Sequence, residues 1–192
     1  MPDHNEVFLS NFEDGEAPAR RYINPNDTPG GIVAVSAKLG KDVFVSANSR
    51  VGPDATVEEG THLDSTRVGR GAMIGKHARL RYTLVGAKSA IGDFVMIAES
   101  TIGSNVGIGS RTSVSSSTIA PDSFLGDSVS FRDCVAKTNS EIGDHAKVVG
   151  AIVCEGASVA PYSHIEAKPL LVTRDGVVVQ GLEQNAPAPV IR

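Results

Sequence analysis

Tryptophan is absent from this chain, aromatic residues make up only 5% of it, and cysteine occurs twice. The scarcity of rings favours a thin core of aliphatic side chains and has no functional meaning by itself. Two cysteines, Cys134 and Cys154, are too few for a disulfide framework or a zinc cluster. We therefore expect both to be reduced, structural thiols.

The chain also lacks any run of basic residues, and its net charge is -4. This excludes the electrostatic footprint of a protein that binds nucleic acid or an anionic membrane. The N-terminus has no basic segment followed by an apolar stretch, and no run approaches the roughly 20 apolar residues of a membrane span. The sequence thus predicts a cytoplasmic protein with neither a nucleic acid nor a membrane as partner.

What the chain does have is a ladder of large aliphatic residues. From Val33 nearly every sixth residue is Val, Ile or Leu, and from Val51 the pattern recurs every 17 residues. Of 24 ladder positions, only Phe131 and Ala136 depart from these three residue types. The positions are Val33, Leu39, Val45, Val51, Val57, Leu63, Val68, Ile74, Leu80, Val85, Ile91, Ile97, Ile102, Ile108, Val114, Ile119, Leu125, Phe131, Ala136, Ile142, Val148, Val153, Val159 and Ile165. A period of this length indicates a repeat array.

A second periodicity gives the local structure. Two residues before most ladder positions the chain has a small residue, as in Ala55, Thr61 and Ala72. Residues two apart on a strand face the same way, so each short strand points one large and one small side chain inward. Glycine follows many of the large residues and provides the backbone freedom of a corner. Three strands and three corners make one triangular coil.

The pattern Leu/Ile/Val-Gly-x-x-small-x resembles the hexapeptide-repeat family over roughly residues 33–166. This resemblance implies an all-β fold, a left-handed parallel β-helix of about eight triangular coils, with a C-terminal hairpin or extension. The shortened third corner is similar to hexapeptide domains attached to sugar-nucleotide pyrophosphorylases. Because members of the family are commonly homotrimers, a homotrimer is expected.

Three regions follow from this interpretation: an N-terminal arm over 1–30, the β-helix over 31–166, and a C-terminal hairpin and tail over 167–192. The arm is expected to be irregular and to cover the open end of the first coil. Residues 170–173 and 177–179 flank Arg-Asp-Gly and are expected to form a hairpin, and 186–192 an extended tail.

The residues just before the ladder positions must point outward, which sorts them into three columns. The first, Arg50, Arg67, Leu84, Thr101, Thr118, Val135 and Ile152, becomes apolar toward its C-terminal end, so we expect the C-terminal hairpin or a neighbouring subunit to cover it. The third face collects four of the five histidines and several cations: His62, His77, Arg79, Arg111, His145, Lys147 and His164.

The resemblance implies that the chain is an acyltransferase. In such enzymes a histidine between adjacent prisms deprotonates an amine or hydroxyl of a small-molecule acceptor, which attacks the thioester of acyl-CoA or acyl carrier protein. His145 beside Lys147 is the first candidate base and His77 beside Arg79 the second. At about 4.8 Å per coil, these two histidines lie roughly 19 Å apart in one chain, too far to share a reaction centre. Phosphate contacts are expected from Arg79, Arg111 and Lys147.

The segments Ile74–Arg81 and Ile91–Val95 are similar to the acetyltransferase half of the bifunctional uridyltransferase that makes UDP-N-acetylglucosamine. This similarity implies that Arg81 contacts a sugar nucleotide. The chain departs from that family at Ala98, where a substrate-binding lysine is expected, and at Ser110, where the catalytic histidine is expected.

A non-catalytic function remains open beside the enzymatic one: a trimeric scaffold, or a regulatory β-helix related to pyrophosphorylase C-terminal domains. Fold alone does not decide between them. No His-x-x-x-x-His pair occurs, so no metal site is predicted, and acyl-CoA is expected only as a co-substrate.

Overall fold

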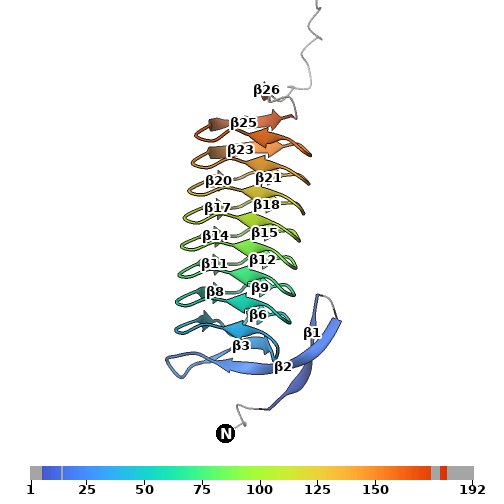
Figure 1. Ribbon diagram of the computed structural model, residues 1–192, viewed down its shortest axis with the longest axis vertical. Coiled ribbons are helices and arrows are strands. Elements are labelled where there is room, and N and C mark those ends of the chain that lie inside the picture. Colours follow the sequence, from blue (N-terminus) through green and yellow to red (C-terminus); the bar gives the residue numbers. More distant parts are fainter. Residues whose placement is uncertain (1–5, 14, 174–177, 181–192) are drawn as a thin grey trace, which may run out of the picture.

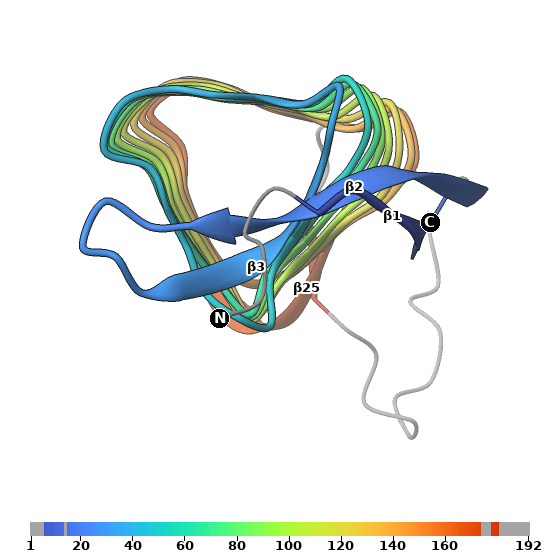
Figure 2. The ribbon, with the colours of Figure 1, turned by 90° about the horizontal axis from the view of Figure 1, so that it is seen from below.

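The computed structural model describes residues 6–13, 15–173 and 178–180, and all regular structure in them is β (Figure 1). Short strands stack on those of the preceding coil, parallel and in register, to form a left-handed β-helix of about eight coils. Seen along its axis, the helix is a triangular prism (Figure 2). The predicted fold class is confirmed.

Each side of the prism is a stack of short strands. The first side contains β6 (Arg50–Val51), β9 (Arg67–Val68), β12 (Leu84–Val85), β15 (Thr101–Ile102), β18 (Thr118–Ile119) and β21 (Val135–Ala136). The second side contains β4 (Lys38–Leu39), β7 (Thr56–Val57), β10 (Met73–Ile74), β13 (Ala90–Ile91), β16 (Gly107–Ile108), β19 (Phe124–Leu125), β22 (Glu141–Ile142) and β24 (Ser158–Val159). The third side contains β5 (Phe44–Val45), β8 (His62–Asp64), β11 (Arg79–Arg81), β14 (Met96–Ala98), β17 (Ser113–Ser115) and β20 (Ser130–Arg132). Toward the C-terminus, β23 (Lys147–Val153) and β25 (His164–Val172) continue from the third side through the corner into the first.

The aliphatic ladder forms the core. Of its 24 positions, 22 are buried, and Leu39 and Ile165, toward the two ends of the ladder, are partly buried against the others. Phe131 is the largest fully buried side chain. It stacks in register between Val114 and Val148, which are shorter than the leucines and isoleucines of the ladder. The ring therefore takes space that its shorter neighbours leave.

The small inward residues also satisfy the backbone at the corners. The Thr61 hydroxyl donates to the carbonyl oxygen of Gly75 (2.7 Å) and accepts the N–H of Ala78 (3.2 Å). Thr112 makes the same two bonds three coils further along the same stack of corners, to Gly126 (2.7 Å) and Val129 (3.1 Å). Within the described residues, no buried side-chain nitrogen or oxygen lacks a hydrogen-bond partner. A core that contains serine and threonine is thus fully paired, as stability requires.

The N-terminal region is not the irregular arm that the sequence suggested. β1 (Phe8–Phe12) pairs antiparallel with β2 (Gly15–Ile23), which pairs antiparallel with β3 (Pro29–Ala34), the first strand of the prism. We call β1 and β2 the N-terminal hairpin. The sequence analysis missed this hairpin because its strands are mostly polar and exposed. The Asp-Gly pair at 14–15 was the signal that could have indicated it.

This hairpin covers the lower end of the prism, as Figure 2 shows for β2. The Asn24 side chain, 2% exposed, accepts the N–H of Val45 (2.8 Å) and donates to its carbonyl oxygen (3.2 Å). The hydroxyl of Tyr22 donates to the carbonyl oxygen of Val43 (3.2 Å). A side-chain amide therefore replaces the strand that a further coil would have supplied.

At the other end, β26 (Val178–Gln180) pairs antiparallel with the last residues of β25. This confirms the C-terminal hairpin that the sequence predicted. The turn at 174–177 and the predicted tail over 186–192 lie outside the described residues. Because β26 lies at the end of the prism (Figure 1), its described residues do not fold back over the first side. On that side it is the N-terminal hairpin that makes a contact, at Arg50.

Candidate functional site

The cations and histidines singled out in the sequence lie on the surface, on or beside the third side. Arg79, Arg81 and Lys147 extend from third-side strands, and all three are exposed. His77, Arg111 and His145 occupy the corner before this side, with backbone φ of 53°, 59° and 59°. Each corner N–H donates to a carbonyl oxygen of the previous coil, as His77 does to Glu59 (2.9 Å). This stacking holds non-glycine residues in a left-handed conformation that they otherwise disfavour.

The same stacking places corner side chains directly above one another. The ring of His77 stacks on Phe94 with 5.2 Å between centroids, and that of His145 on Tyr162 at 4.8 Å. Each candidate base thus packs against an exposed aromatic ring of the next coil. The two histidines lie four coils apart and do not come together within one chain.

Two of the predicted contact residues do meet. Arg79 and Arg81 line a shallow hollow of about 320 Å³ on the third side, together with His62 and Asp64. Arg79 is directly opposite His62 in the parallel register, and Arg81 opposite Asp64. The guanidinium of Arg81 also lies 5.8 Å from the centroid of the Tyr82 ring. The hollow therefore presents two cations beside one carboxylate.

A second cluster lies toward the C-terminal end of the third side, and we call it the His164 cluster. His164 Nε2 lies 3.0 Å from Glu166 Oε2, and Lys147 Nζ lies 3.5 Å from the same oxygen. The hydrogen bond from His164 and the charge of Lys147 lower the pKa of Glu166, so it is held as a carboxylate. This cluster contains Lys147, which was a candidate, and adds a histidine and a carboxylate that were not.

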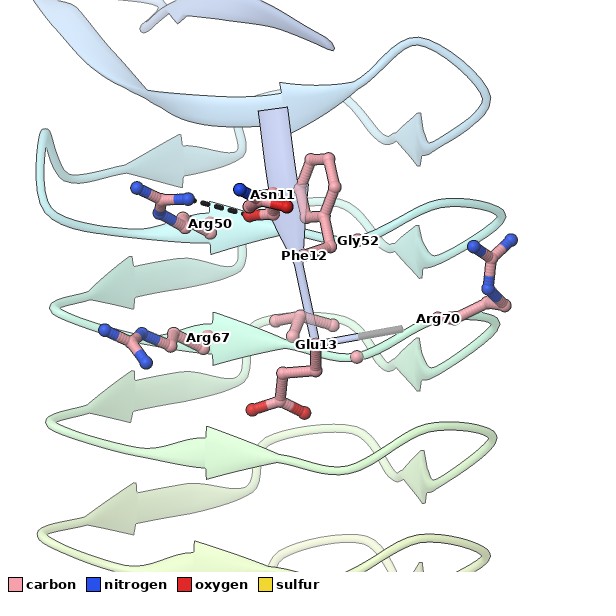
Figure 3. Close-up of a pocket in the computed structure, with 9 residues that line it drawn as sticks. Asn11, Phe12, Glu13, Arg50, Gly52, Arg67 and Arg70 are labelled. Atoms are coloured by element: carbon pink, nitrogen blue, oxygen red, sulfur yellow. Dashed lines mark hydrogen bonds between the residues drawn. The ribbon is translucent and has the colours of Figure 1, made fainter. Parts of the chain in front are cut away.

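A pocket of about 290 Å³ lies at the other end, between the N-terminal hairpin and the first side (Figure 3). We call it the hairpin pocket. Asn11, Phe12 and Glu13 form one wall, and three arginines, Arg50, Arg67 and Arg70, extend from the coils behind them. Arg50 Nη1 donates to the carbonyl oxygen of Asn11 (2.8 Å), which links the hairpin to the prism. Arg70 lies 3.5 Å from the carboxylate of Asp54.

Comparison with protein families adds a decisive observation: the family described as the GMPPB C-terminal domain matches residues 28–129. This is more than half of the chain. The chain belongs to the GMPPB C-terminal domain family. The match confirms the sequence resemblance to the β-helix domains of pyrophosphorylases.

Several solved structures are similar to this family member in fold. They include LpxA, a UDP-N-acetylglucosamine acyltransferase from Bacteroides fragilis, with 13% identity, 77% of this chain and 71% of that chain covered, and a TM-score of 0.36. The UDP-N-acetylglucosamine acyltransferase from Campylobacter jejuni has 19% identity, 73% and 67% coverage, and a TM-score of 0.40. A comparison with curated proteins found no match.

In this member of the GMPPB C-terminal domain family, the hydrogen bonds of Ser110 stabilise the corners of the prism. Its hydroxyl accepts the N–H of Asp93 (3.2 Å), and its own N–H donates to Asp127 Oδ1 (2.6 Å). The N–H of Asp127 donates in turn to Asp144 Oδ1 (2.8 Å). Ser110 is therefore one step of a hydrogen-bonded ladder that joins successive corners. Within the described residues, the Ser110 hydroxyl makes no hydrogen bond to a histidine or lysine side chain that could activate it as a nucleophile.

Two kinds of structural feature are absent from the described residues of this family member. No group of three or more His, Cys, Asp or Glu side chains there is arranged to hold a metal ion. None of the described residues form a helix long and apolar enough to cross a membrane.

Sequence reasoning missed two features of these sites. Glu166 pairs with His164 from two residues along the same strand, so both side chains lie on one face. The His-x-Glu spacing was the signal. The hairpin pocket depends on a contact between Asn11 and Arg50 across 39 residues of sequence, which no local pattern reports. Only the adjacency of Arg50 and Arg67 in the first column pointed toward it.

Proposed function

We propose that the chain is a cytoplasmic acyltransferase whose reaction takes place at the His164 cluster. The observation that supports this is the contact of His164 with Glu166 at 3.0 Å, beside Lys147. A histidine oriented by a carboxylate is the usual arrangement of a general base. We assign the base to His164 in preference to His145, because His145 packs against the Tyr162 ring and His164 has the carboxylate partner.

The chemistry follows from this pair. With Glu166 accepting a hydrogen bond from Nε2, the Nδ1 atom of His164 keeps its lone pair and removes a proton from the amine or hydroxyl of the acceptor. The acceptor attacks the carbonyl carbon of an acyl thioester, the C–S bond breaks, and the thiol leaves with the proton that His164 returns. Lys147 supplies positive charge beside the developing oxyanion or the phosphates of acyl-CoA.

The site requires a second copy of the chain. The side chains of His164 and Glu166 are 59% and 60% exposed in a single protomer. A transfer reaction needs water to be kept from the thioester, so an adjacent prism in a homotrimer would have to cover the cluster. The homotrimer is therefore part of this proposal.

A second function is favoured by family membership. The chain matches a pyrophosphorylase C-terminal domain, and Ala98 and Ser110 stand where the acetyltransferase resemblance expects a lysine and a histidine. On this alternative, the prism is a regulatory or scaffolding β-helix, and the His164 cluster is a surface ion pair of small energetic value.

Ligand binding and thioester cleavage separate the two functions. The chain would be melted with acetyl-CoA, succinyl-CoA and UDP-N-acetylglucosamine, since a ligand that binds the native state raises its melting temperature. Release of CoA thiol would then be followed with a panel of amine and hydroxyl acceptors. We expect a shift with an acyl-CoA and a rate that falls about 100-fold or more in His164→Ala. Glu166→Gln should lose less, because the base remains.

The matched control is His62→Ala, which removes an exposed histidine from the same column near the other end of the third side. Its rate should equal that of the unaltered chain. If no acyl-CoA raises the melting temperature, the regulatory function is favoured. If a rate is found and His164→Ala leaves it intact while His145→Ala removes it, our assignment of the base is wrong.

A further inference from the structure

The hairpin pocket contains an electrostatic arrangement that the stability of the fold does not explain. β6 and β9 are parallel neighbours, and Arg50 lies directly opposite Arg67. Like charges directly opposite each other on adjacent strands destabilise a sheet. Further along the same column, the next residue is Leu84, so the two arginines occur only in the coils beside β1.

The charges nearby neutralise this pair only in part. Arg50 uses one nitrogen to bind the neutral carbonyl group of Asn11 at 2.8 Å. Among the described residues, no hydrogen bond or ion pair is made by the Arg67 side chain, and Asp54 is engaged with Arg70 at 3.5 Å. Of the described residues that line the pocket, Glu13 alone carries a carboxylate. Arg50 and Arg67 therefore make no ion pair with a described carboxylate, and their positive charge remains available to a ligand.

The walls of the pocket indicate what kind of anion would fit. Two guanidinium groups on adjacent strands can bind a phosphate through several charge-assisted hydrogen bonds. A volume of about 290 Å³ exceeds what a bare phosphate needs. Phe12 provides an apolar surface for an organic group, and Glu13 can accept hydrogen bonds from its hydroxyl or amino groups (Figure 3).

We propose that the hairpin pocket binds a phosphate ester of a small molecule with hydroxyl or amino groups, such as a nucleoside phosphate or a sugar phosphate. The phosphate lies between Arg50 and Arg67, and the organic part lies against Phe12 with its donors toward Glu13. This site is at the opposite end of the prism from the His164 cluster (Figure 1) and does not depend on acyl transfer. It also gives the N-terminal hairpin a role beyond covering the first coil.

Isothermal titration calorimetry of the full chain tests the proposal with AMP, glucose 6-phosphate, inorganic phosphate and adenosine. We expect at least one ester to bind about tenfold or more tightly than inorganic phosphate, and adenosine not to bind. Arg67→Gln should weaken ester binding about tenfold or more, because it removes a charged hydrogen-bond donor from the phosphate. Arg132→Gln, which alters an exposed arginine of the third side, should leave it unchanged.

A second variant, Glu13→Gln, distinguishes the organic part of the ligand from the phosphate. It should tighten inorganic phosphate, because a negative charge is removed, and reduce the preference for the ester. Equal binding of inorganic phosphate and both esters would mean an adventitious anion only and would overturn the proposal. It would also be overturned if neither ester binds at millimolar concentration, or if Arg67→Gln and Arg132→Gln have the same effect.

Discussion

Truncation of Phe131 should destabilise the protein more than truncation of any exposed aromatic residue. Phe131 is fully buried in a prism whose interior holds few rings, and it stacks between Val114 and Val148. Ala136, the other ladder position that is not Val, Ile or Leu, lies on the next strand and is also fully buried. We infer that the ring fills space that the methyl group of Ala136 leaves in the thin core.

The magnitude follows from the loss of a buried ring. A Phe→Ala change in a closed core costs about 3–5 kcal/mol, because contacts are lost and a cavity remains. In a chain of this size each kcal/mol corresponds to about 2–4 °C of melting temperature, so Phe131→Ala should melt about 6–20 °C lower. Ala136→Leu in the same chain should recover part of this loss by refilling the space.

Thermal and urea unfolding, followed by circular dichroism, would measure both changes. The matched control is Phe124→Ala, because this ring is 48% exposed on the second side and packs over Gly107. Its loss should cost about a third as much or less. Equal losses in the two variants would refute the placement of Phe131 in a closed core. A failure of Ala136→Leu to recover any stability would refute the inferred sharing of space.

Three further predictions concern other parts of the molecule. Asn24→Ala should cost about 1–3 kcal/mol and speed amide exchange of the N-terminal hairpin, because both backbone groups of Val45 lose their partners; unchanged exchange would contradict this. The pKa of Glu166 is lowered, so its pairing with His164 stabilises the fold above the ordinary carboxyl range and is lost as pH falls through the lowered pKa. The difference in melting temperature between the unaltered chain and Glu166→Gln should therefore shrink as the pH is lowered from neutral to below the ordinary carboxyl range. Burial raises the pKa of the Cys134 thiol, so it should resist alkylation at neutral pH until the protein unfolds, which peptide mass spectrometry would show.

The β-helix could be predicted from the sequence because every coil repeats the same requirement. One large residue must point inward on each side, so the phase of Ile91, Ile108 and Leu125 also fixes which residues point outward. That phase correctly placed Arg79, Lys147 and His164 on the exterior of one side. The repeat pattern alone was sufficient to predict which residues point outward, because no contact between distant parts of the sequence is needed for it.

The ends of the prism and the sites could not be predicted in the same way. The N-terminal hairpin has no repeat to fix its register, and its contacts join Asn24 to Val45 and Asn11 to Arg50 across long stretches of sequence. Grouping residues by column also says nothing about which side chains touch. The structure pairs His164 with Glu166 and leaves His77 and His145 on separate coils.

The antiparallel pairing of β2 with β3 limits how copies of this protein can associate. End-to-end growth into a filament would need the first strand of one prism to offer an unpaired parallel edge to the last strand of another. β2 already occupies that edge with the opposite chain direction, and Asn24 satisfies the neighbouring backbone groups. Head-to-tail growth of prisms into a filament is therefore blocked at this end.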